Sequence, residues 1–261
     1  MEQLFNTALL AAQSAGHYIY SHLHETVTVN YKGETNLVTQ VDRKAEEMII
    51  SIIREAFPEH RILAEESPAL VSDSPYRWII DPLDGTTNFV HGVPIFSVSI
   101  ALEHRGELLL GVVYDPCRKE IFSAIRGQGA YVNKEPIRVS ATPTLIRSLT
   151  ATGFPYENGA VFDANMQIFS EVYRRSQGVR RAGSAALDIC YVASGRFDGF
   201  WEFSLNPWDV AAGALIVLEA GGRVEDFDSG QFRTENASRI IATNGLIHTE
   251  LLNIIRQHLP K

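Results

Sequence analysis

The sequence of 261 residues is poor in cysteine and lacks long apolar runs. Its two cysteines, Cys117 and Cys190, are too few for a disulfide framework, and their separation is not that of a metal-binding pair. This usage fits a reducing compartment, and we expect a cytoplasmic protein. No apolar run reaches the length of a membrane span, and the first residues lack the pattern of a secretory signal. We therefore expect no association with a membrane.

Basic residues are fewer than acidic ones. The chain has 23 lysines and arginines against 31 aspartates and glutamates, which gives a formal net charge of -8. Because nucleic acid phosphates require a basic surface, we expect no nucleic-acid partner. The eight histidines lack zinc-ligand spacing, and the sequence contains neither a Walker loop nor a Gly-x-Ser-x-Gly elbow. Nucleotide motors and serine esterases are therefore excluded as leading hypotheses.

The first half of the sequence combines helices with a series of strands. Apolar residues at a spacing of three to four predict helices at about 4–24 and 39–58, and the second opens with a capping-box pattern at Thr39 and Asp42. Short apolar or alternating runs predict strands at 61–64, 77–80, 96–102, 108–114, 120–124 and 130–132. The later strands are joined by short polar loops, which is typical of an antiparallel meander.

The pattern changes after about residue 143. Helix patterns alternate with short strand-like runs, at 162–175, 185–194, 209–220 and 249–258. We expect an α+β fold, layered as an αβαβα sandwich, with the antiparallel meander sheet in residues 1–143 and a smaller α/β half in 144–261. Because no linker separates the halves, we expect one compact unit in which the first half holds a metal and the second completes a substrate cleft.

Two acids occur together at the end of one apolar strand. Asp81 and Asp84 flank Pro82 and Leu83. The proline restricts Asp81 to extended geometry, and Asp84 with Gly85 makes a turn. This arrangement can direct both carboxylates and the Leu83 carbonyl to one point in space. The alternative is an ordinary turn that faces water.

The residues that follow this turn favour a functional site. Thr86, Thr87 and Asn88 resemble a helix start, whose free backbone amides form an anion site beside the two acids. Two like charges about 4 Å apart repel by roughly 4 kcal/mol at an effective dielectric constant of about 20, so clustered acids require protons or a metal. Ligand sets made of oxygen alone favour magnesium over zinc.

Five segments, in order along the chain, resemble the signatures of the inositol monophosphatase family. They are 36–42 (NLVTQVD), 65–67 (EES), 78–89 (WIIDPLDGTTNF), 180–186 (RRAGSAA) and 208–222, which begins with WDVAAG and ends with EAGG. The match covers nearly the whole chain. It implies a magnesium-dependent phosphatase of small phosphorylated metabolites.

The resemblance also implies a metal site with two or more magnesium ions. Glu65, Asp81, the Leu83 carbonyl and Asp84 resemble the family's ligands of the first ion. Asp81, Asp84 and Asp209 resemble the ligands of the second. A site of this kind holds the phosphate oxygens, orients a water molecule and neutralises the leaving alkoxide.

Three residues are implied to act on the attacking water or behind it. The resemblance assigns Glu65 and the Thr86 hydroxyl to activation of the water, and Asp42 to a hydrogen bond behind Thr86. Each assignment has a structural alternative. Thr86 and Asp209 would both serve as N-caps of the helices that follow them, and Asp42 as an exposed acid in the first turn of a helix.

The implied substrate contacts come from both halves of the chain. They are Leu83, Asp84, Gly85, Thr86 and Asp209 on the phosphate side, and Gly183, Ser184, Ala185 and Glu202 on the side of the alcohol. Lys32, in a loop, could meet the phosphate. Without the resemblance, Glu202 would be a solvated charge, Lys32 a surface residue, and Gly183 with Ser184 a helix entrance.

The leading hypothesis is hydrolysis of myo-inositol monophosphate, a phosphorylated polyol, by a lithium-sensitive homodimer, as the resemblance implies. Fructose 1,6-bisphosphate, histidinol phosphate and adenosine 3',5'-bisphosphate are alternative substrates of the same chemistry. Asn206 and Pro207 depart from the residues common in animal inositol phosphatases and leave this choice open. An alternative of another class is a regulatory binding protein that retains the phosphatase fold. Its expected basic, aromatic-rich patch is not seen in the sequence.

Overall fold

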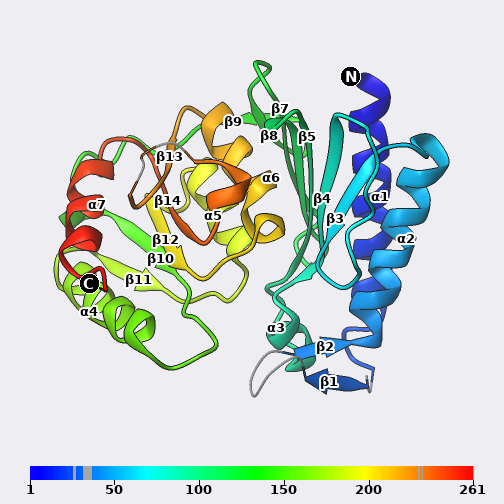
Figure 1. Ribbon diagram of the computed structural model, residues 1–261. Helices are drawn as coiled ribbons and strands as arrows, with labels where there is room; N and C mark the ends of the chain where they lie inside the picture. Colours follow the sequence, from blue (N-terminus) through cyan, green and yellow to red (C-terminus); the bar gives the residue numbers. More distant parts are fainter. Residues whose placement is uncertain (26–27, 32–36, 229, 231, 261) are drawn as a thin grey trace.

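The chain folds into alternating layers of helix and sheet (Figure 1). The computed structural model describes residues 1–25, 28–31, 37–228, 230 and 232–260, so Lys32 lies outside the described residues. From one face to the other, the helical layers are α1 (Glu2–Ser21) with α2 (Gln40–Ala56), then α5 (Ala185–Ala193) with α6 (Pro207–Glu219), and then α4 (Ala160–Arg174) with α7 (His248–Gln257). One sheet lies between each pair of helical layers, which confirms the predicted αβαβα sandwich.

The larger sheet has seven strands in chain order. They are β3 (Arg61–Ala64), β4 (Tyr76–Asp84), β5 (Ser97–His104), β6 (Glu107–Asp115), β7 (Glu120–Ile125), β8 (Ala130–Val132) and β9 (Glu135–Ile137). Only the β3–β4 pair is parallel among the pairings of this sheet. The predicted antiparallel meander is confirmed. The sequence analysis missed β9 and a separate two-stranded sheet of β1 (Val29–Tyr31) and β2 (Leu37–Thr39), because strands of three residues carry too little periodicity.

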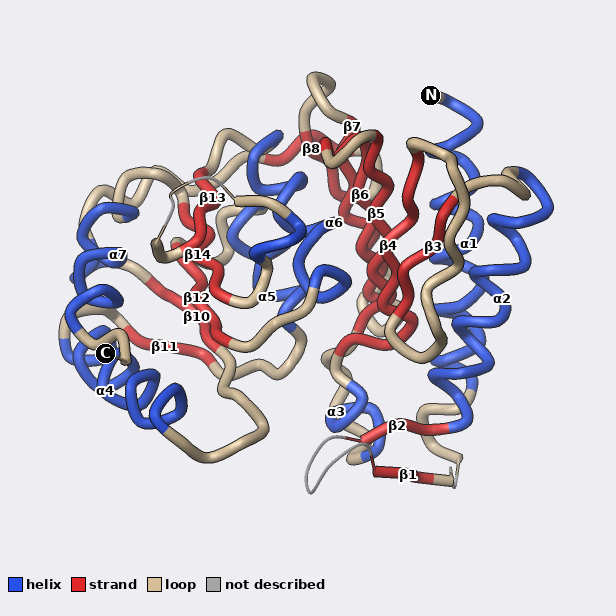
Figure 2. Tube along the Cα trace, in the orientation of Figure 1, coloured by secondary structure: helices blue, strands red, loops and turns tan. Residues whose placement is uncertain are grey.

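The smaller sheet has the strand order β11-β10-β12-β14-β13. Its strands are β10 (Leu149–Thr152), β11 (Gly178–Arg180), β12 (Gly199–Phe203), β13 (Arg223–Asp226) and β14 (Arg239–Thr243). Strand β10 is parallel to β11 and β12, whereas β14 is antiparallel to β12 and β13. Figure 2 shows this sheet apart from the larger one, with α5 and α6 between them. Three short elements complete the chain, α3 (Thr86–Val90) and the 3₁₀ turns at Leu145–Arg147 and Thr234–Asn236.

Helix α6 is apolar on every side, because sheets cover both of its faces. All residues from 210 to 217 are buried, whereas α2 and α7 expose one polar face to solvent. The contact with the larger sheet is close at Gly111 of β6. A Cβ atom there would lie 2.7 Å from the Ala212 oxygen and 2.9 Å from the Ala212 Cα. Glycine at this position therefore sets how near α6, and the residues at its start, come to the sheet.

Polar contacts also join the first half to the second at the end of the sheet where β4 begins. The Arg77 Nε lies 2.7 Å from Glu103 Oε1, and the Thr234 hydroxyl donates to Glu103 Oε2 over 3.0 Å. All three side chains are largely buried. The division of the chain at residue 143 stays a prediction. Within the described ranges, we find no helix with the length and hydrophobicity needed to cross a membrane.

Candidate active site

Strand β4 contains a bulge that decides where its two acids point. Its pairing with β5 matches Asp81 with Ser99 and Asp84 with Ser97, so one extra residue lies on the β4 side. In a regular strand, residues three apart point to opposite faces. One extra residue reverses that relation, and Asp81 and Asp84 therefore point to the same face. Pro82 lies within the bulge, beyond the last β3–β4 pairing, where its missing N–H costs no sheet hydrogen bond.

Packing around the bulge agrees with this orientation. Leu83 packs in the same core cluster as Trp78 and Ile80, on the face of the sheet that α1 and α2 cover. On the opposite face, the Ser99 hydroxyl donates to the Trp208 carbonyl over 3.2 Å. The two acids therefore point toward the start of α6. Both are largely buried, with 1% and 9% exposure.

Glu65 is brought beside Asp81 by the parallel pairing of β3 with β4. The register matches Ala64 with Ile80, so Glu65 is the next residue after β3 at the level of Asp81. Helix α2 stabilises the turn that follows Glu65. The buried carboxylate of Glu46, on α2, accepts the Glu66 N–H over 2.8 Å. The sequence analysis missed Glu46, whose signal was a carboxylate within an otherwise apolar helix face.

Gly85 allows the chain to turn from β4 into α3. Its φ of +96° lies in the left-handed region. Gly85 is the N-cap of α3, so the alternative of Thr86 as the N-cap is wrong. A Cβ atom at this position would also lie 3.0 Å from the Ile95 carbonyl oxygen and 3.2 Å from that of Gly183. Glycine is therefore required here both for the turn and for the approach of the second half of the chain.

The Thr86 hydroxyl lies between Asp42 and the Leu83 carbonyl. Its oxygen is 2.8 Å from Asp42 Oδ1 and 3.1 Å from the Leu83 oxygen. Asp42 Oδ2 accepts the Thr39 N–H and hydroxyl, at 2.9 and 2.5 Å, which confirms the predicted capping box. The alternative of an exposed Asp42 is wrong, since the residue is 1% exposed. Burial raises the pKa of Asp42, although hydrogen bonds from Thr39 and Thr86 oppose the shift.

Asp84 is bound directly by the start of α5. Its Oδ2 accepts the Ser184 hydroxyl at 2.5 Å and the Ala186 N–H at 2.9 Å. Ser184 is the N-cap of α5, and Ala185 begins the helix, so this carboxylate lies at a helix N-terminus. Burial raises the pKa of Asp84 to about 6, while the hydrogen bonds from Ser184 and Ala186 oppose the rise.

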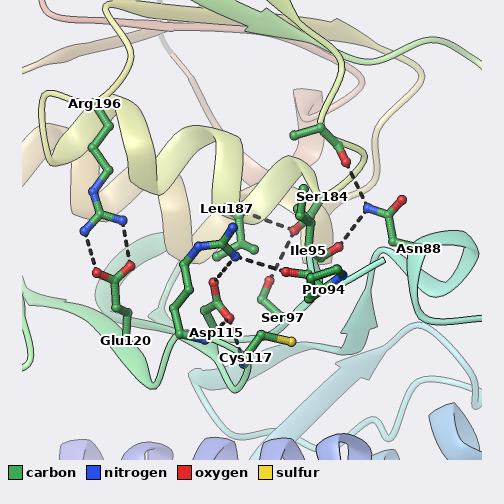
Figure 3. Close-up of polar contacts among 12 residues, drawn as sticks. Asn88, Pro94, Ile95, Ser97, Asp115, Cys117, Glu120, Ser184, Leu187 and Arg196 are labelled. Atoms are coloured by element: carbon green, nitrogen blue, oxygen red, sulfur yellow. Dashed lines mark hydrogen bonds and ion pairs between the residues drawn. The ribbon is translucent and has the colours of Figure 1, made fainter. Parts of the chain in front are cut away.

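Asn88 and Gly183 join the same two parts of the chain. Figure 3 shows the Asn88 amide reaching the Ile95 carbonyl, at 2.8 Å, and a second carbonyl, that of Ala182, at 2.9 Å. Gly183 has a φ of +92°, and a Cβ atom there would lie 2.9 Å from Asn88 Nδ2. The Ser97 and Ser184 hydroxyls, also drawn in Figure 3, are 3.4 Å apart. The predicted Gly183 to Ala185 segment therefore lies directly on the Asp84 loop.

Asp209 is the third residue of α6 and not its N-cap, so the N-cap alternative is wrong. The N-cap is Asn206, whose N–H donates to Asp209 Oδ2 over 2.7 Å. Pro207 begins the helix, a position in which proline loses no hydrogen bond. Burial raises the pKa of Asp209 well above its usual range, and the Asn206 N–H opposes this effect.

The four acids influence one another. The pKa of Asp81 is raised well above its usual range, first by burial and then by the carboxylates of Glu65, Asp84 and Asp209. Burial raises the pKa of Asp81, Asp84 and Asp209, and a hard cation would neutralise these three carboxylates. With the Leu83 carbonyl, the donor set consists of oxygen atoms alone.

The side chains do not form a finished metal cage. Among the residues that the structure describes, no group of three or more His, Cys, Asp or Glu side chains is arranged to hold a metal ion. Each of three acids has one oxygen in a hydrogen bond, and Asp81 Oδ1 accepts the Leu83 N–H at 2.9 Å. Asp84 and Asp209 each direct an oxygen to a donor in the same way.

Glu202 lies on β12, in the smaller sheet, and faces the same acids. Its pKa is raised well above the usual range, first by burial, with the Arg181 guanidinium opposing the shift and the carboxylates of Asp188, Asp209 and Asp84 adding to it. The residue is 9% exposed, so the solvated alternative is wrong. The structure therefore brings residues of both predicted halves to one place.

The match to known proteins covers all of these residues. The model of the inositol monophosphatase family matches residues 1–259. The chain belongs to this family. Inositol monophosphatase family proteins are metal-dependent phosphatases, which agrees with a site made of carboxylates. The resemblance seen in the sequence is confirmed, while the roles of the individual residues stay predictions.

Family members similar to this chain carry two kinds of name. The inositol-1-monophosphatase of Synechocystis sp. is 47% identical, over 92% of this chain and 84% of its own length. The Nus factor SuhB of Pseudomonas aeruginosa is 45% identical, over 100% of this chain and 98% of its own length. The crystal structure of extragenic suppressor protein suhB from Bartonella henselae has a TM-score of 0.94 at 42% identity, and the match covers 98% of this chain and 99% of that chain.

Proposed function

We propose that the protein is a magnesium-dependent phosphomonoesterase that hydrolyses myo-inositol monophosphate to inositol and phosphate. The observation that carries the proposal is the β4 bulge, which turns Asp81 and Asp84 to one face beside Glu65 and opposite Asp209. The name of the Synechocystis relative supports inositol monophosphate as the substrate. Fructose 1,6-bisphosphate, histidinol phosphate and adenosine 3',5'-bisphosphate remain the alternatives of the same chemistry.

In this proposal the acids and the Leu83 carbonyl hold two or more magnesium ions. Bound magnesium supplies positive charge for the phosphate and leaving oxygens. Glu65, Asp81 and Asp84 come from one sheet, whereas Asp209 comes from a helix packed against it, so the site requires both. The Gly85 turn and α3 bring the Thr86 hydroxyl to Asp42 and to the Leu83 carbonyl.

The hydrogen bonds of Thr86 give its hydroxyl a direction. A threonine hydroxyl has one proton, and Asp42 Oδ1 at 2.8 Å is the nearer and charged acceptor. When the proton lies toward Asp42, the oxygen of Thr86 presents its lone pairs away from Asp42. We infer that the Thr86 oxygen takes one proton from the attacking water while its own proton passes to Asp42, and that the Glu65 carboxylate accepts a hydrogen bond from the same water.

Thr86→Val tests this role. Valine keeps the shape of the side chain and removes the hydroxyl, so kcat should fall by about 100-fold or more, the usual contribution of a general base. The KM should change much less, and Thr86→Ser should recover most of the rate. The matched control is Thr87→Val in the adjacent, exposed position. Equal kcat values for the Thr86 and Thr87 variants would refute the assignment.

The proposed activity is tested by phosphate release from a panel of substrates. The metal-free protein should be inactive on myo-inositol monophosphate and should recover activity when magnesium is added. The three alternative substrates enter the panel at equal concentration, and the highest kcat/KM identifies the preferred one. Absence of magnesium-dependent release from every member would refute the phosphatase proposal.

Three further properties belong to the same proposal through the family resemblance. We propose that lithium inhibits the enzyme by competing at a magnesium position, that the protein is a homodimer and that it is cytoplasmic. A lithium titration, sedimentation of the purified protein and cell fractionation test these properties one by one. A monomer in sedimentation would refute the dimer without affecting the catalytic proposal.

A second candidate function follows from the name of the P. aeruginosa relative. A chain 45% identical to a Nus factor over its whole length could act as a regulatory binding protein. The net charge of -8 favours a protein partner over direct contact with nucleic acid in that case. Affinity capture with an inactive Asp84→Asn variant tests this role, because binding that persists in the variant would be independent of catalysis. Failure to retain any partner would count against it.

A further inference from the structure

Strands β10 and β12 run parallel and are neighbours in the smaller sheet (Figure 2). The last matched pair joins Thr152 to Trp201, so the next residues, Gly153 and Glu202, lie at one level of the sheet. The Thr152 hydroxyl donates to the Trp201 carbonyl over 2.7 Å and adds a bond to this pairing. A side chain at position 153 would therefore point to the same face of the sheet as the side chain of Glu202.

That face is the one covered by α5. Phe200, two residues before Glu202, packs in the same core cluster as Ala186 of α5, whereas Trp201 packs in the cluster under α4 and α7. Because side chains alternate along a strand, Glu202 shares the face of Phe200. The Ala186 N–H also donates to Asp84 Oδ2 over 2.9 Å. Helix α5 therefore contacts both the Glu202 face of the smaller sheet and the Asp84 loop of the larger one.

Gly153 lies directly against the carboxyl group of Glu202. The three atoms nearest to a Cβ atom built at position 153 would be Oε1, Cδ and Oε2 of Glu202, all closer than non-bonded atoms approach. Gly153 is not among the glycines with a positive φ, so its backbone conformation is open to other residues. The glycine is thus required by the neighbouring carboxyl group and not by a turn.

Helix α4 fixes the Gly153 backbone from the other face of the sheet. The Asn165 side chain is 0% exposed. Its Nδ2 donates to the Gly153 carbonyl over 2.6 Å, and its Oδ1 accepts the Trp201 indole N–H over 2.8 Å. Movement of Gly153 would leave a buried amide without its acceptor, which is costly. A side chain added at position 153 would therefore displace the carboxyl group of Glu202 rather than the backbone.

We infer that Gly153 is a positioning residue, whose missing side chain allows the Glu202 carboxyl group to take the direction in which it binds the alcohol part of the substrate. The inference rests on the proposed function, in which Glu202 contacts the polyol. A carboxylate accepts hydrogen bonds over a short range of distance and angle. Displacement by one methyl group would therefore remove the bond to the substrate and leave the phosphate side of the site, on β4 and α6, in place.

Gly153→Ala tests this inference in the magnesium-loaded enzyme. The KM for myo-inositol monophosphate should rise about tenfold or more, as expected for the loss of one hydrogen bond to a charged group, with kcat within about threefold of the parent. The inhibition constant of inorganic phosphate, which has no alcohol part, should stay unchanged. The matched control is Gly159→Ala, which adds the same methyl group at the end of the same loop with no atom within 4 Å. Its constants should equal those of the parent.

A double variant separates positioning from a general structural effect. Glu202→Ala removes the carboxyl group and makes room for a methyl group at position 153. The Gly153→Ala/Glu202→Ala protein should therefore have the kinetic constants of Glu202→Ala alone, because the two changes act through one contact. If Gly153→Ala by itself fails to fold, the double variant still decides, since it should fold when Glu202 alone occupies the space.

Three results would overturn the inference. They are an unchanged KM in Gly153→Ala, a weakening of phosphate inhibition by the same factor as the rise in KM, and a double variant that is unfolded or in which the two losses multiply. A parent enzyme that hydrolyses no member of the substrate panel would instead refute the proposed function. That outcome is distinct because it precedes any comparison of variants.

Discussion

Asp84→Asn is expected to lower kcat/KM by about 1000-fold or more and, at the same time, to stabilise the metal-free protein at neutral pH. The loss of activity follows because an amide is a poor ligand for magnesium, and charge neutralisation at such a site is worth several kcal/mol. Asparagine has nearly the shape of aspartate, and its oxygen can still accept from Ser184 and Ala186. The fold should therefore be retained.

The gain in stability follows from the pKa of Asp84. Burial raises this pKa to about 6, above the ordinary value of 3.8, so the folded state favours the protonated carboxyl group. Without metal, the destabilisation from this group therefore develops between about pH 4 and pH 6 and is complete above pH 6. Stability should rise as the pH falls through 6 toward 4, where the group is protonated in both states. The neutral asparagine should remove this dependence and add about 2 kcal/mol to the free energy of unfolding at pH 7.5.

Denaturant unfolding in the presence of a chelator, at pH 7.5 and at pH 4, close to the ordinary pKa of 3.8, measures both effects. The difference between parent and Asp84→Asn should be large at the higher pH and small at the lower one. Asp73→Asn removes an exposed acid and should behave like the parent. Added magnesium should stabilise the parent more than Asp84→Asn. A variant that is less stable than the parent at pH 7.5 would contradict this account of the buried charge.

The second large effect is expected at Gly111, where one added methyl group should weaken both the fold and the activity. In Gly111→Ala, the new Cβ would lie 2.7 Å from the Ala212 oxygen, a backbone atom that cannot rotate away. The helix must move off the sheet, at a cost of about 1–3 kcal/mol. Because Asp209 lies one turn before Ala212 on α6, the same movement would draw it away from Asp81 and Asp84.

The melting temperature and kcat should therefore both fall in Gly111→Ala. The control is Gly159→Ala, at a position with an extended backbone and no atom within 4 Å of the added Cβ. The control should retain the parent's activity and lose little stability. Loss of stability in Gly111→Ala with full activity would show that Asp209 is not positioned through this contact.

Local patterns were sufficient to predict most of the regular elements. The apolar spacing of α2 and the pattern at Thr39 and Asp42 predicted the helix and its capping box, and both are present. The alternation in β5 and β6 predicted their antiparallel pairing. Sequence patterns did not predict the strand order of the smaller sheet, because the parallel pairing of β10 with β12 joins segments about 50 residues apart.

The candidate site depends on contacts that a local pattern does not contain. The direction of Asp84 is decided by a bulge, and a bulge is defined by the register with β5 rather than by the sequence of β4. The local sequence left the exposed-acid alternative for Asp42 open, because its partner Thr86 is 44 residues away.

The hydrogen bonds from Ser184 and Ala186 to Asp84 have a consequence for any attempt to divide the protein. A fragment that ends at residue 143 would keep Asp81, Asp84 and Glu65 but lose both donors to Asp84. It would also expose the sheet face that α5 and α6 cover. The acids of the first half are thus a complete sequence motif without being an autonomous module. Exchange of one half between family members must therefore preserve the contact between the start of α5 and Asp84.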